Sequence, residues 1–220
     1  MTGDGTVAGD PVPAFSAILR EQTRSEHRHA ETTPYADALA RGQVDRAGFA
    51  MLVRQHHAIY EALESASDAL RDDAVAGPFV IDELRRLPAL VVDLHAAHGA
   101  DWATLPVLPA TAEYVAAIEA TVEAPHRFIA HHYVRYLGDL SGGQIVMRML
   151  ERAGLGGAAS FYVFDGIPHK PHFKARYRGL LDEAPLSDAQ RAEVIGEARA
   201  AFRHNSAVFH DLGGFIPQAA

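Results

Sequence analysis

Polar and apolar positions repeat with the period of a helix along almost the whole chain. Apolar residues recur at spacings of three and four, whereas the strict alternation of a strand is scarce. We therefore expect an all-α fold. The pattern predicts a short helix after Pro34 and longer ones over 14–30, 45–71, 78–95, 111–122, 125–153, 172–181 and 187–212.

Several residues mark where these helices start or stop. Asp45 is expected to cap the helix that follows it, and Ser187 with Gln190 forms a capping-box sequence. Pro125 suits an early position of its helix. Pro88 is expected to bend or break the segment that contains it, because proline removes a helical hydrogen bond.

The chain shows no internal repeat and no linker long enough to divide two domains. We expect a single domain over residues 14–213, with a disordered tail over 1–13 and a short tail over 214–220. The first residues do not resemble a signal peptide, and no stretch approaches the ~18 apolar residues of a membrane helix. The expectation is a cytoplasmic protein with no membrane partner.

Composition narrows the possible chemistry. The chain has no cysteine, which excludes disulfides, iron–sulfur clusters, zinc–thiolate sites and a thiolate-ligated haem. It has 13 histidines, so histidine is the best remaining soft ligand for a transition metal. A net charge of −8 argues against a nucleic-acid partner. The open question is which of the histidines performs chemistry.

One predicted helix contains glycines in its apolar middle, at positions 138, 142 and 143. Each costs about 1 kcal/mol relative to alanine, so a compensating role is expected. Glycine lets a flat ligand approach the backbone closely, or lets the helix bend. The segment is not a phosphate loop, since Gln144 stands where a lysine is needed. Spacing alone leaves a helix kink or a tight helix crossing equally open.

The string HHYVRYLGDLSGGQ, from His131 to Gln144, closely resembles the distal-helix signature of the haem oxygenases. The resemblance extends from about Ala14 to Leu212. Residues 19–31 resemble the proximal helix of that family and 201–209 its last helix, while 161–164 and 173–178 resemble the segment at the propionate edge. It implies a fold that holds haem b between the first helix and a kinked, glycine-rich distal helix.

The resemblance selects an iron ligand. His27, followed by Ala30 and Glu31, matches the family's axial histidine, and Glu31 would orient its ring. An imidazole ligand leaves the opposite face of the iron open for O2. Helical periodicity does not choose His27 over His29, which remains the rival.

On the distal side, Gly138 and Gly142 are expected to lie over the porphyrin and to leave room for bound O2. Asp139 resembles the carboxylate that organises a water network and delivers protons through it. As an isolated residue it would more often be a solvated helix aspartate. The resemblance places three more residues in this network or its frame: Tyr60, Arg135 and Asn205.

Four residues match the family's contacts to the two haem propionates: Arg20, Tyr133, Lys174 and Arg178. Lys174 and Arg178 share a helix face, because they are four residues apart. Without the resemblance, a solvated basic face is the more ordinary interpretation. Phe202 on the last helix is also expected to contact the haem. Two prolines, at 168 and 171, depart from the family pattern before the basic helix.

By resemblance, the activity is oxygen-dependent opening of haem to biliverdin with release of CO and Fe2+. Haem is both substrate and prosthetic group. Electrons must come from an external donor of the ferredoxin or flavodoxin type, since no flavin or nicotinamide motif is present. The expected role is iron acquisition or haem turnover. The sequence decides neither the donor, nor the meso carbon attacked, nor the oligomeric state.

Two alternatives stay open. A protein that stores haem would keep His27 and the cations without needing Asp139. A di-iron carboxylate bundle needs paired Glu-x-x-His motifs, and Glu26–His29 and Glu123–His126 have that spacing. The adjacent histidine pairs at 56–57 and 131–132 are expected to be structural or surface residues.

Overall fold

The computed structural model describes residues 13–217, and these residues form helices and loops without a strand. The all-α prediction is therefore confirmed. The α-helices of this part are α1 (Phe15–Gln22), α2 (Arg24–Glu31), α3 (Pro34–Ala40), α4 (Arg46–Ala69), α5 (Leu87–Ala97), α6 (Pro109–Glu119), α7 (Pro125–His132), α8 (Gly138–Arg152), α9 (Lys170–Glu183) and α10 (Asp188–Leu212).

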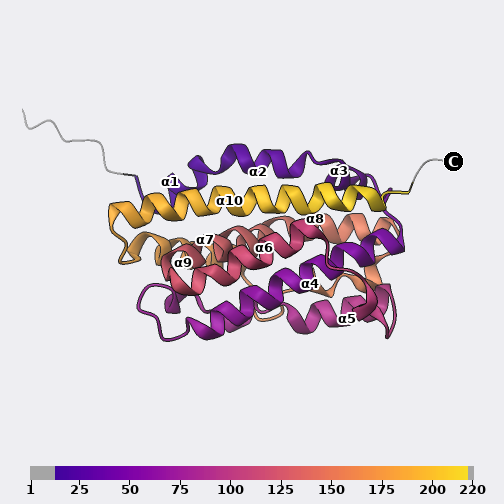
Figure 1. Ribbon diagram of the computed structural model, residues 1–220, viewed down its shortest axis with the longest axis horizontal. Helices are drawn as coiled ribbons and strands as arrows, with labels where there is room; N and C mark the ends of the chain where they lie inside the picture. The colour runs from indigo at the N-terminus through magenta and orange to yellow at the C-terminus, as the bar shows by residue number, and fades with distance from the viewer. Residues whose placement is uncertain (1–12, 218–220) are drawn as a thin grey trace, which may run out of the picture.

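The helix α10 runs along nearly the whole length of the molecule (Figure 1). It packs against α2 and α3 on one side and against α6 and α7 on the other. The long helix α4 packs in turn against α5 and α6. No helix among the described residues combines the length and apolarity needed to cross a membrane.

The expected caps form. The Asp45 carboxylate accepts a hydrogen bond from the Gly48 amide at 2.8 Å, which satisfies one of the free donors at the start of α4. Ser187 and Gln190 form both bonds of the capping box at the start of α10. Pro125 lies in the first turn of α7, as predicted.

The predicted single helix over 14–30 is two helices. It breaks at Thr23, whose backbone leaves helical geometry at φ −106° and ψ 1°. The buried Thr23 hydroxyl donates to the Leu19 carbonyl at 2.8 Å, and such a side-chain bond competes with the regular backbone ladder. The break lets α1 and α2 follow different directions, so His27 stands on a helix of its own.

The segment around Pro88 also differs from the prediction. Pro88 neither bends nor breaks a helix but lies in the first turn of α5, where its missing N–H costs nothing. Two short 3-10 turns, Gly77–Phe79 and Asp82–Leu84, precede it. Likewise α9 begins at Lys170 rather than 172, with Pro171 in its first turn.

The predicted helix over 125–153 contains a π-helical turn, Tyr133–Leu137, between α7 and α8. The distortion therefore precedes Gly138 instead of lying at the glycines. A π-turn inserts one extra residue and is frequent at functional sites. It turns α8 relative to α7 and buries Arg135 within the bundle.

The adjacent histidine pairs lie in the interior. His132 Nδ1 hydrogen-bonds the Tyr177 hydroxyl at 2.8 Å, and burial lowers the pKa of His132 to about 3, which keeps the ring neutral. His56 packs against Phe161 at 5.2 Å between ring centroids. These histidines are structural, as expected, and they are core residues rather than surface residues.

The C-terminal end of α10 continues into a 3-10 turn, Gly213–Phe215. The carbonyl oxygen of Phe215 lies 2.6 Å from the place that a Cβ on Gly48 would occupy, so this close approach requires glycine. The predicted N-terminal tail falls outside the described residues, apart from Pro13, and so do residues 218–220 of the predicted C-terminal tail.

Asp93 on α5 holds the loop that supports the distal helix. Its buried carboxylate accepts from the Ser160 amide at 2.8 Å, the Ser160 hydroxyl at 2.6 Å and the Phe161 amide at 2.8 Å. Phe161 packs edge-on against Tyr60, with ring centroids 5.2 Å apart. One carboxylate thus fixes a loop on which a candidate site residue rests.

We predict that Asp93→Ala lowers the free energy of unfolding by about 2–3 kcal/mol, because the Ser160 and Phe161 amides lose their acceptor. Urea denaturation of both proteins measures the difference. The control is Asp72→Ala at an exposed aspartate, which should shift stability by less than about 0.5 kcal/mol. Equal small effects for the two variants would show that the loop is held by other contacts.

Candidate active site

Gly138 and Gly142 line an open face of α8. A Cβ built on either residue meets no other atom within 4 Å. The two glycines are four residues apart, so they lie on one side of the helix, one turn from each other. The helix therefore presents bare backbone to open space there, and an apolar flat ligand could approach it closely.

Gly143, unlike Gly138 and Gly142, packs closely against another part of the protein. A Cβ at this position would lie 3.1 Å from Cδ1 and 3.3 Å from Cβ of Tyr162. Gly143 is buried, and its missing side chain lets Tyr162 pack directly on the helix backbone. Gly143 therefore lets the 3-10 turn Ser160–Tyr162 pack closely on α8, whereas Gly138 and Gly142 leave open backbone.

Asp139 lies between the two glycines in the sequence, and its side chain is half-buried. The Tyr60 hydroxyl donates a short hydrogen bond to Asp139 Oδ2. Burial raises the pKa of Asp139 above its usual range, while Arg135 and the bond from Tyr60 act in the opposite direction. Burial and the nearby carboxylate raise the pKa of Tyr60 well above its ordinary value, so the phenol remains a donor.

Arg135 lies in the π-turn and is almost fully buried. It donates from Nη1 to Asn205 Oδ1 at 2.7 Å, and its guanidinium carbon lies 5.0 Å from the centre of the Tyr60 ring. Burial alone would lower the pKa of Arg135, but Tyr60 and Asp139 outweigh it and raise the pKa. The structure thus brings Tyr60, Arg135, Asp139 and Asn205 into one connected group.

His27 stands on α2 with 51% of its side chain exposed. Its Nδ1 lies 3.5 Å from Glu31 Oε2, and its ring contacts Phe202 of α10 edge-on, with centroids 5.5 Å apart. Nε2 has no hydrogen-bond partner among residues 13–217. His29, the rival, is exposed and has neither a carboxylate nor an aromatic ring against it in the described chain.

The predicted cations meet near the π-turn. Burial raises the pKa of Tyr133, while the positive charges of Arg178 and Arg20 act against that rise. Lys174 Nζ lies 3.4 Å from the Ser141 hydroxyl on α8. Within the described chain, no carboxylate pairs with any of the three cations. In a protein of net charge −8, this is an unneutralised positive site.

These contacts surround one region of the molecule. On one side, α10 bridges α2 to the π-turn through Phe202 and Asn205. On the other side, α9 approaches α8 through Lys174 and packs against α1. The Asp182 carboxylate on α9 accepts a hydrogen bond from the Ser16 amide on α1 at 2.7 Å, which joins α9 to α1. These contacts connect α1 and α2 to the distal helix through α9 and α10.

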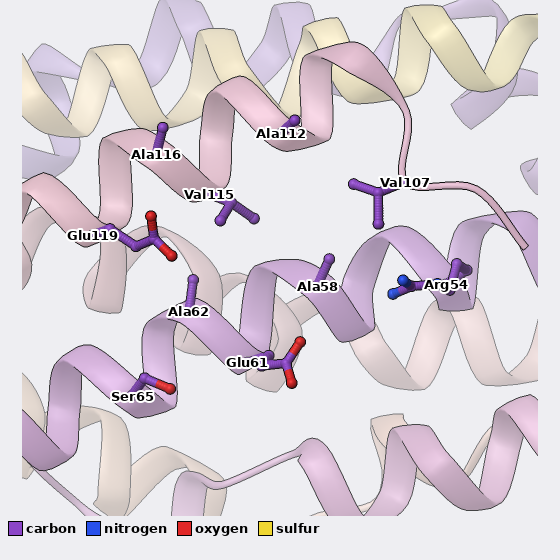
Figure 2. Close-up of a pocket in the computed structure, with 10 residues that line it drawn as sticks. All are labelled: Arg54, Ala58, Glu61, Ala62, Ser65, Val107, Ala112, Val115, Ala116 and Glu119. Carbon is purple, nitrogen blue, oxygen red and sulfur yellow. The ribbon is translucent and has the colours of Figure 1, made fainter. Parts of the chain in front are cut away.

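A separate cavity of about 380 Å³ lies between α4 and α6 (Figure 2). None of the predicted site residues lines it. Its walls are small and apolar residues with charged groups at the rim: Arg54, Ala58, Glu61, Ala62, Ser65, Val107, Ala112, Val115, Ala116 and Glu119.

The di-iron alternative does not fit the geometry. His126 Nε2 bonds Glu193 Oε2 at 2.9 Å, and Glu26 Oε1 lies 3.6 Å from Arg199. In the part of the chain that the structure describes, no group of three or more histidine, aspartate and glutamate side chains converges as metal ligands. One residue of each Glu-x-x-His motif, Glu26 and His126, instead forms an ion pair with α10.

Sequence reasoning missed Tyr114 and Ser141. Tyr114 is fully buried on α6, its hydroxyl has no partner among the described residues, and Arg135 acts on its pKa. Ser141 supplies the hydroxyl near Lys174. A tyrosine in an apolar helix face carries no special signal in a sequence, so only the tertiary fold reveals that Tyr114 lies beside Arg135.

The comparisons with known proteins agree with this geometry. A family model described as "Heme oxygenase" matches residues 13–211. The chain belongs to the haem oxygenase family. Heme oxygenase 1 of Gallus gallus is 34% identical over 212 residues, covering 93% of this chain and 72% of the relative. Heme oxygenase 1 of Nostoc sp. is 33% identical over 206 residues, covering 91% and 87%.

Solved haem oxygenase structures share the fold. The chain is similar to heme oxygenase-1 from Synechocystis sp. in complex with heme, with a TM-score of 0.89, 30% identity, and coverage of 93% of this chain and 94% of that one. It is also similar to heme oxygenase from Leptospira interrogans, with a TM-score of 0.85, 32% identity, and coverage of 90% and 99%. The chain is thus a haem oxygenase of the oxidoreductase class.

The residues present fit a haem. The two glycines leave a face that any Cβ would begin to fill, and a flat ring needs such a face. An imidazole with a free Nε2 suits an iron, and unpaired cations suit two carboxylates. Arg135 keeps two buried donors, Nε and Nη2, without a protein partner in the described chain, as expected beside ordered water.

The two kinds of glycine should respond oppositely to alanine in the haem-free protein. Gly142→Ala should raise the free energy of unfolding by about 0.5–1 kcal/mol, because alanine favours the helix and meets no neighbour. Gly143→Ala should lower it by about 1 kcal/mol or more, because Tyr162 must move. Urea titration measures both, and shifts of the same sign would contradict these assignments.

Proposed function

We propose that this haem oxygenase binds haem b between α2 and the open face of α8, and that it opens the ring to biliverdin with release of CO and Fe2+. One observation carries the proposal: Gly138 and Gly142 leave an open helix face next to Asp139, whose half-buried carboxyl group accepts a hydrogen bond from Tyr60. Bound haem supplies the iron that binds O2 and is itself the molecule that is opened.

His27 is the proposed iron ligand through Nε2. Glu31 near Nδ1 favours the tautomer that carries its proton on that nitrogen, which leaves the Nε2 lone pair free for a metal. Phe202 limits the rotation of the imidazole by its edge contact. On the other face, Gly138 and Gly142 keep side chains away from the ring and leave room for O2.

Arg20, Lys174 and Arg178 are the proposed partners of the two propionates, with the Tyr133 hydroxyl as a further donor. Bound carboxylates would neutralise a cluster of cations that has no carboxylate of its own in the described chain. Arg178 and Arg20 both lie near Tyr133, so the propionate edge would lie beside the π-turn.

Asp139 is the proposed organiser of proton delivery. Its pKa, raised by burial, brings the carboxyl group closer to neutral pH, where it can both take and give a proton. Tyr60 fixes one carboxyl oxygen and leaves the other for water. Arg135 and Asn205 hold the frame behind this pair. Delivery through water, without a strong acid against the iron, suits an enzyme that oxidises its own haem.

Electrons for the reaction come, in this proposal, from an external donor of the ferredoxin or flavodoxin type. The sequence contains no flavin or nicotinamide motif that would supply them from within the chain. A cytoplasmic location fits such a donor. The proposed biological role is iron acquisition or haem turnover.

Reduction of the purified haem complex under O2 tests the function. We expect biliverdin in the visible spectrum and CO in the headspace. The variant Asp139→Ala should bind haem with an affinity within about threefold of the wild-type protein, but make biliverdin at least about tenfold more slowly. Asp72→Ala is the control and should behave as wild type.

Two results would contradict the proposal in different ways. A wild-type complex whose haem stays intact under reductant and O2 would favour haem storage. Unchanged turnover in Asp139→Ala would leave ring opening in place but remove the role assigned to the carboxylate.

A further inference from the structure

A buried hydrogen bond joins α7 to α9 directly beside two of the predicted propionate contacts. His132 Nδ1 lies 2.8 Å from the Tyr177 hydroxyl, and the two rings are nearly parallel, at 7° with centroids 5.7 Å apart. Both side chains are almost fully removed from solvent. Tyr133 directly follows His132 in the chain, and Arg178 directly follows Tyr177. The bond therefore connects the two segments that carry these contacts.

Aromatic rings surround this pair. Tyr136 and Phe128 pack against His132, with ring centroids 4.5 and 5.4 Å away. Phe79 packs edge-on against Tyr177 at 5.5 Å. Burial lowers the pKa of His132 to about 3 and raises the pKa of Tyr177 well above its ordinary value, so both groups are uncharged at neutral pH. Polar atoms buried among such rings must keep their partner, because an unsatisfied buried donor or acceptor is strongly unfavourable.

In the part of the chain that the structure describes, two hydrogen bonds join α9 to the segment from α7 to α8. The second, from Lys174 Nζ to the Ser141 hydroxyl, is 3.4 Å long and exposed. Toward α1, the Asp182 carboxylate of α9 accepts from the Ser16 amide at 2.7 Å and from its hydroxyl at 3.1 Å. The bond at Tyr177 is thus the short and buried one that sets how α9 stands against the π-turn.

A helix moves as a rigid unit, so whatever holds Tyr177 also places its neighbours on α9. Lys174 and Arg178 are four residues apart and project from one face of the helix, one turn from each other. The positive charge of Arg178 acts on the pKa of Tyr133, against the rise that burial causes. A shift or rotation of α9 at Tyr177 would therefore move both cations relative to the Tyr133 hydroxyl.

We propose that His132 and Tyr177 are positioning residues for the propionate edge of the haem site. Their hydrogen bond sets where α9 stands against the π-turn, so that Arg178 on α9 and Tyr133 in the turn reach the same pair of carboxylates. Lys174 follows, because it shares a helix face with Arg178. Each of the two positioning residues acts through its neighbours and not by contact with the ligand. The inference rests on the proposed function, since it concerns how the bound haem is held.

Four variants separate this role from general stability. His132→Leu and Tyr177→Phe break the hydrogen bond. His132→Asn keeps it, because the asparagine amide lies near the position of Nδ1 and can both accept and donate. Tyr35→Phe is the control: it removes another buried hydrogen bond, from the Tyr35 hydroxyl to the Gly48 carbonyl oxygen at 2.8 Å, which joins α3 to α4.

The first test is titration of hemin and of hemin dimethyl ester into each purified full chain, followed by the Soret band. The ester has no free carboxylate, so the ratio of the two dissociation constants measures carboxylate recognition. Wild type should bind hemin about tenfold or more tightly than the ester, because charge-assisted hydrogen bonds are lost with the ester. Both bond-breaking variants should lose about threefold or more of this ratio, by binding hemin more weakly at unchanged affinity for the ester. His132→Asn and Tyr35→Phe should keep the ratio within about twofold of wild type.

An unchanged ratio in both His132→Leu and Tyr177→Phe would overturn the proposal. If the two affinities fall together, the bond supports only the fold, and if neither falls, the bond does not matter for binding. If His132→Leu does not fold, Tyr177→Phe still decides, since it removes a single oxygen atom.

The second test needs no haem. In the full chain labelled with carbon-13 at tyrosine Cζ, the signal of Tyr133, assigned through Tyr133→Phe, reports on the positive charge that acts on its phenol. Arg178→Gln removes this charge and defines the reference shift. Both bond-breaking variants should move the signal in the same direction, whereas His132→Asn and Tyr35→Phe should leave it in place. A Tyr133 signal that does not move in either bond-breaking variant would overturn the proposal.

The two measurements separate this inference from the proposed function. A wild-type protein that binds no hemin refutes the proposed function, and the Tyr133 signal then still tests whether the bond places Arg178. A protein that binds hemin and forms biliverdin, but whose Tyr133 signal stays in place when the bond is broken, overturns the positioning role alone.

Discussion

A flat ligand can contact the backbone of a helix only where the helix carries no side chains on the facing side. The distal helix meets this requirement at Gly138 and Gly142, which face open space. Each glycine costs the helix about 1 kcal/mol, so the segment needs support from elsewhere. Support comes from the packing of Tyr162 on Gly143 and from the anchored loop that carries Tyr162. The helix thus lacks side-chain contacts at Gly138 and Gly142 but gains a close contact with Tyr162 at Gly143.

The π-turn and the start of α8 also carry two charged side chains, Arg135 and Asp139. Asp139 and Arg135 lie within one turn of each other, and neither charged group is in direct ion-pair contact with the other. Tyr60 mediates between them: it donates to the carboxylate and presents its ring to the guanidinium. Arg135 lies buried in the π-turn, and the glycines with the open face follow directly after it.

Much of this could be predicted from the chain alone. Apolar spacing and the caps at Asp45 and Ser187 give the helices, since these signals are local. The candidate site residues come from the resemblance of the distal motif to the haem oxygenases, because the spacing of the glycines alone leaves a helix kink or a tight crossing equally open. The break at Thr23 and the π-turn could not be predicted from the sequence. Each depends on which of several hydrogen bonds of similar strength the backbone forms. Tyr114 could not be found from the sequence for a different reason: its burial in the core depends on tertiary packing.

The assignment that links all of these elements is the iron ligand on α2, and titration of hemin into matched variants tests it most directly. His27→Ala should lose or shift the Soret band of the one-to-one complex and weaken hemin binding. His29→Ala, an exposed histidine two residues away, should bind hemin as the wild-type protein does. The reverse result, with His29→Ala losing the band and His27→Ala keeping it, would contradict the placement of haem between α2 and the open face of α8.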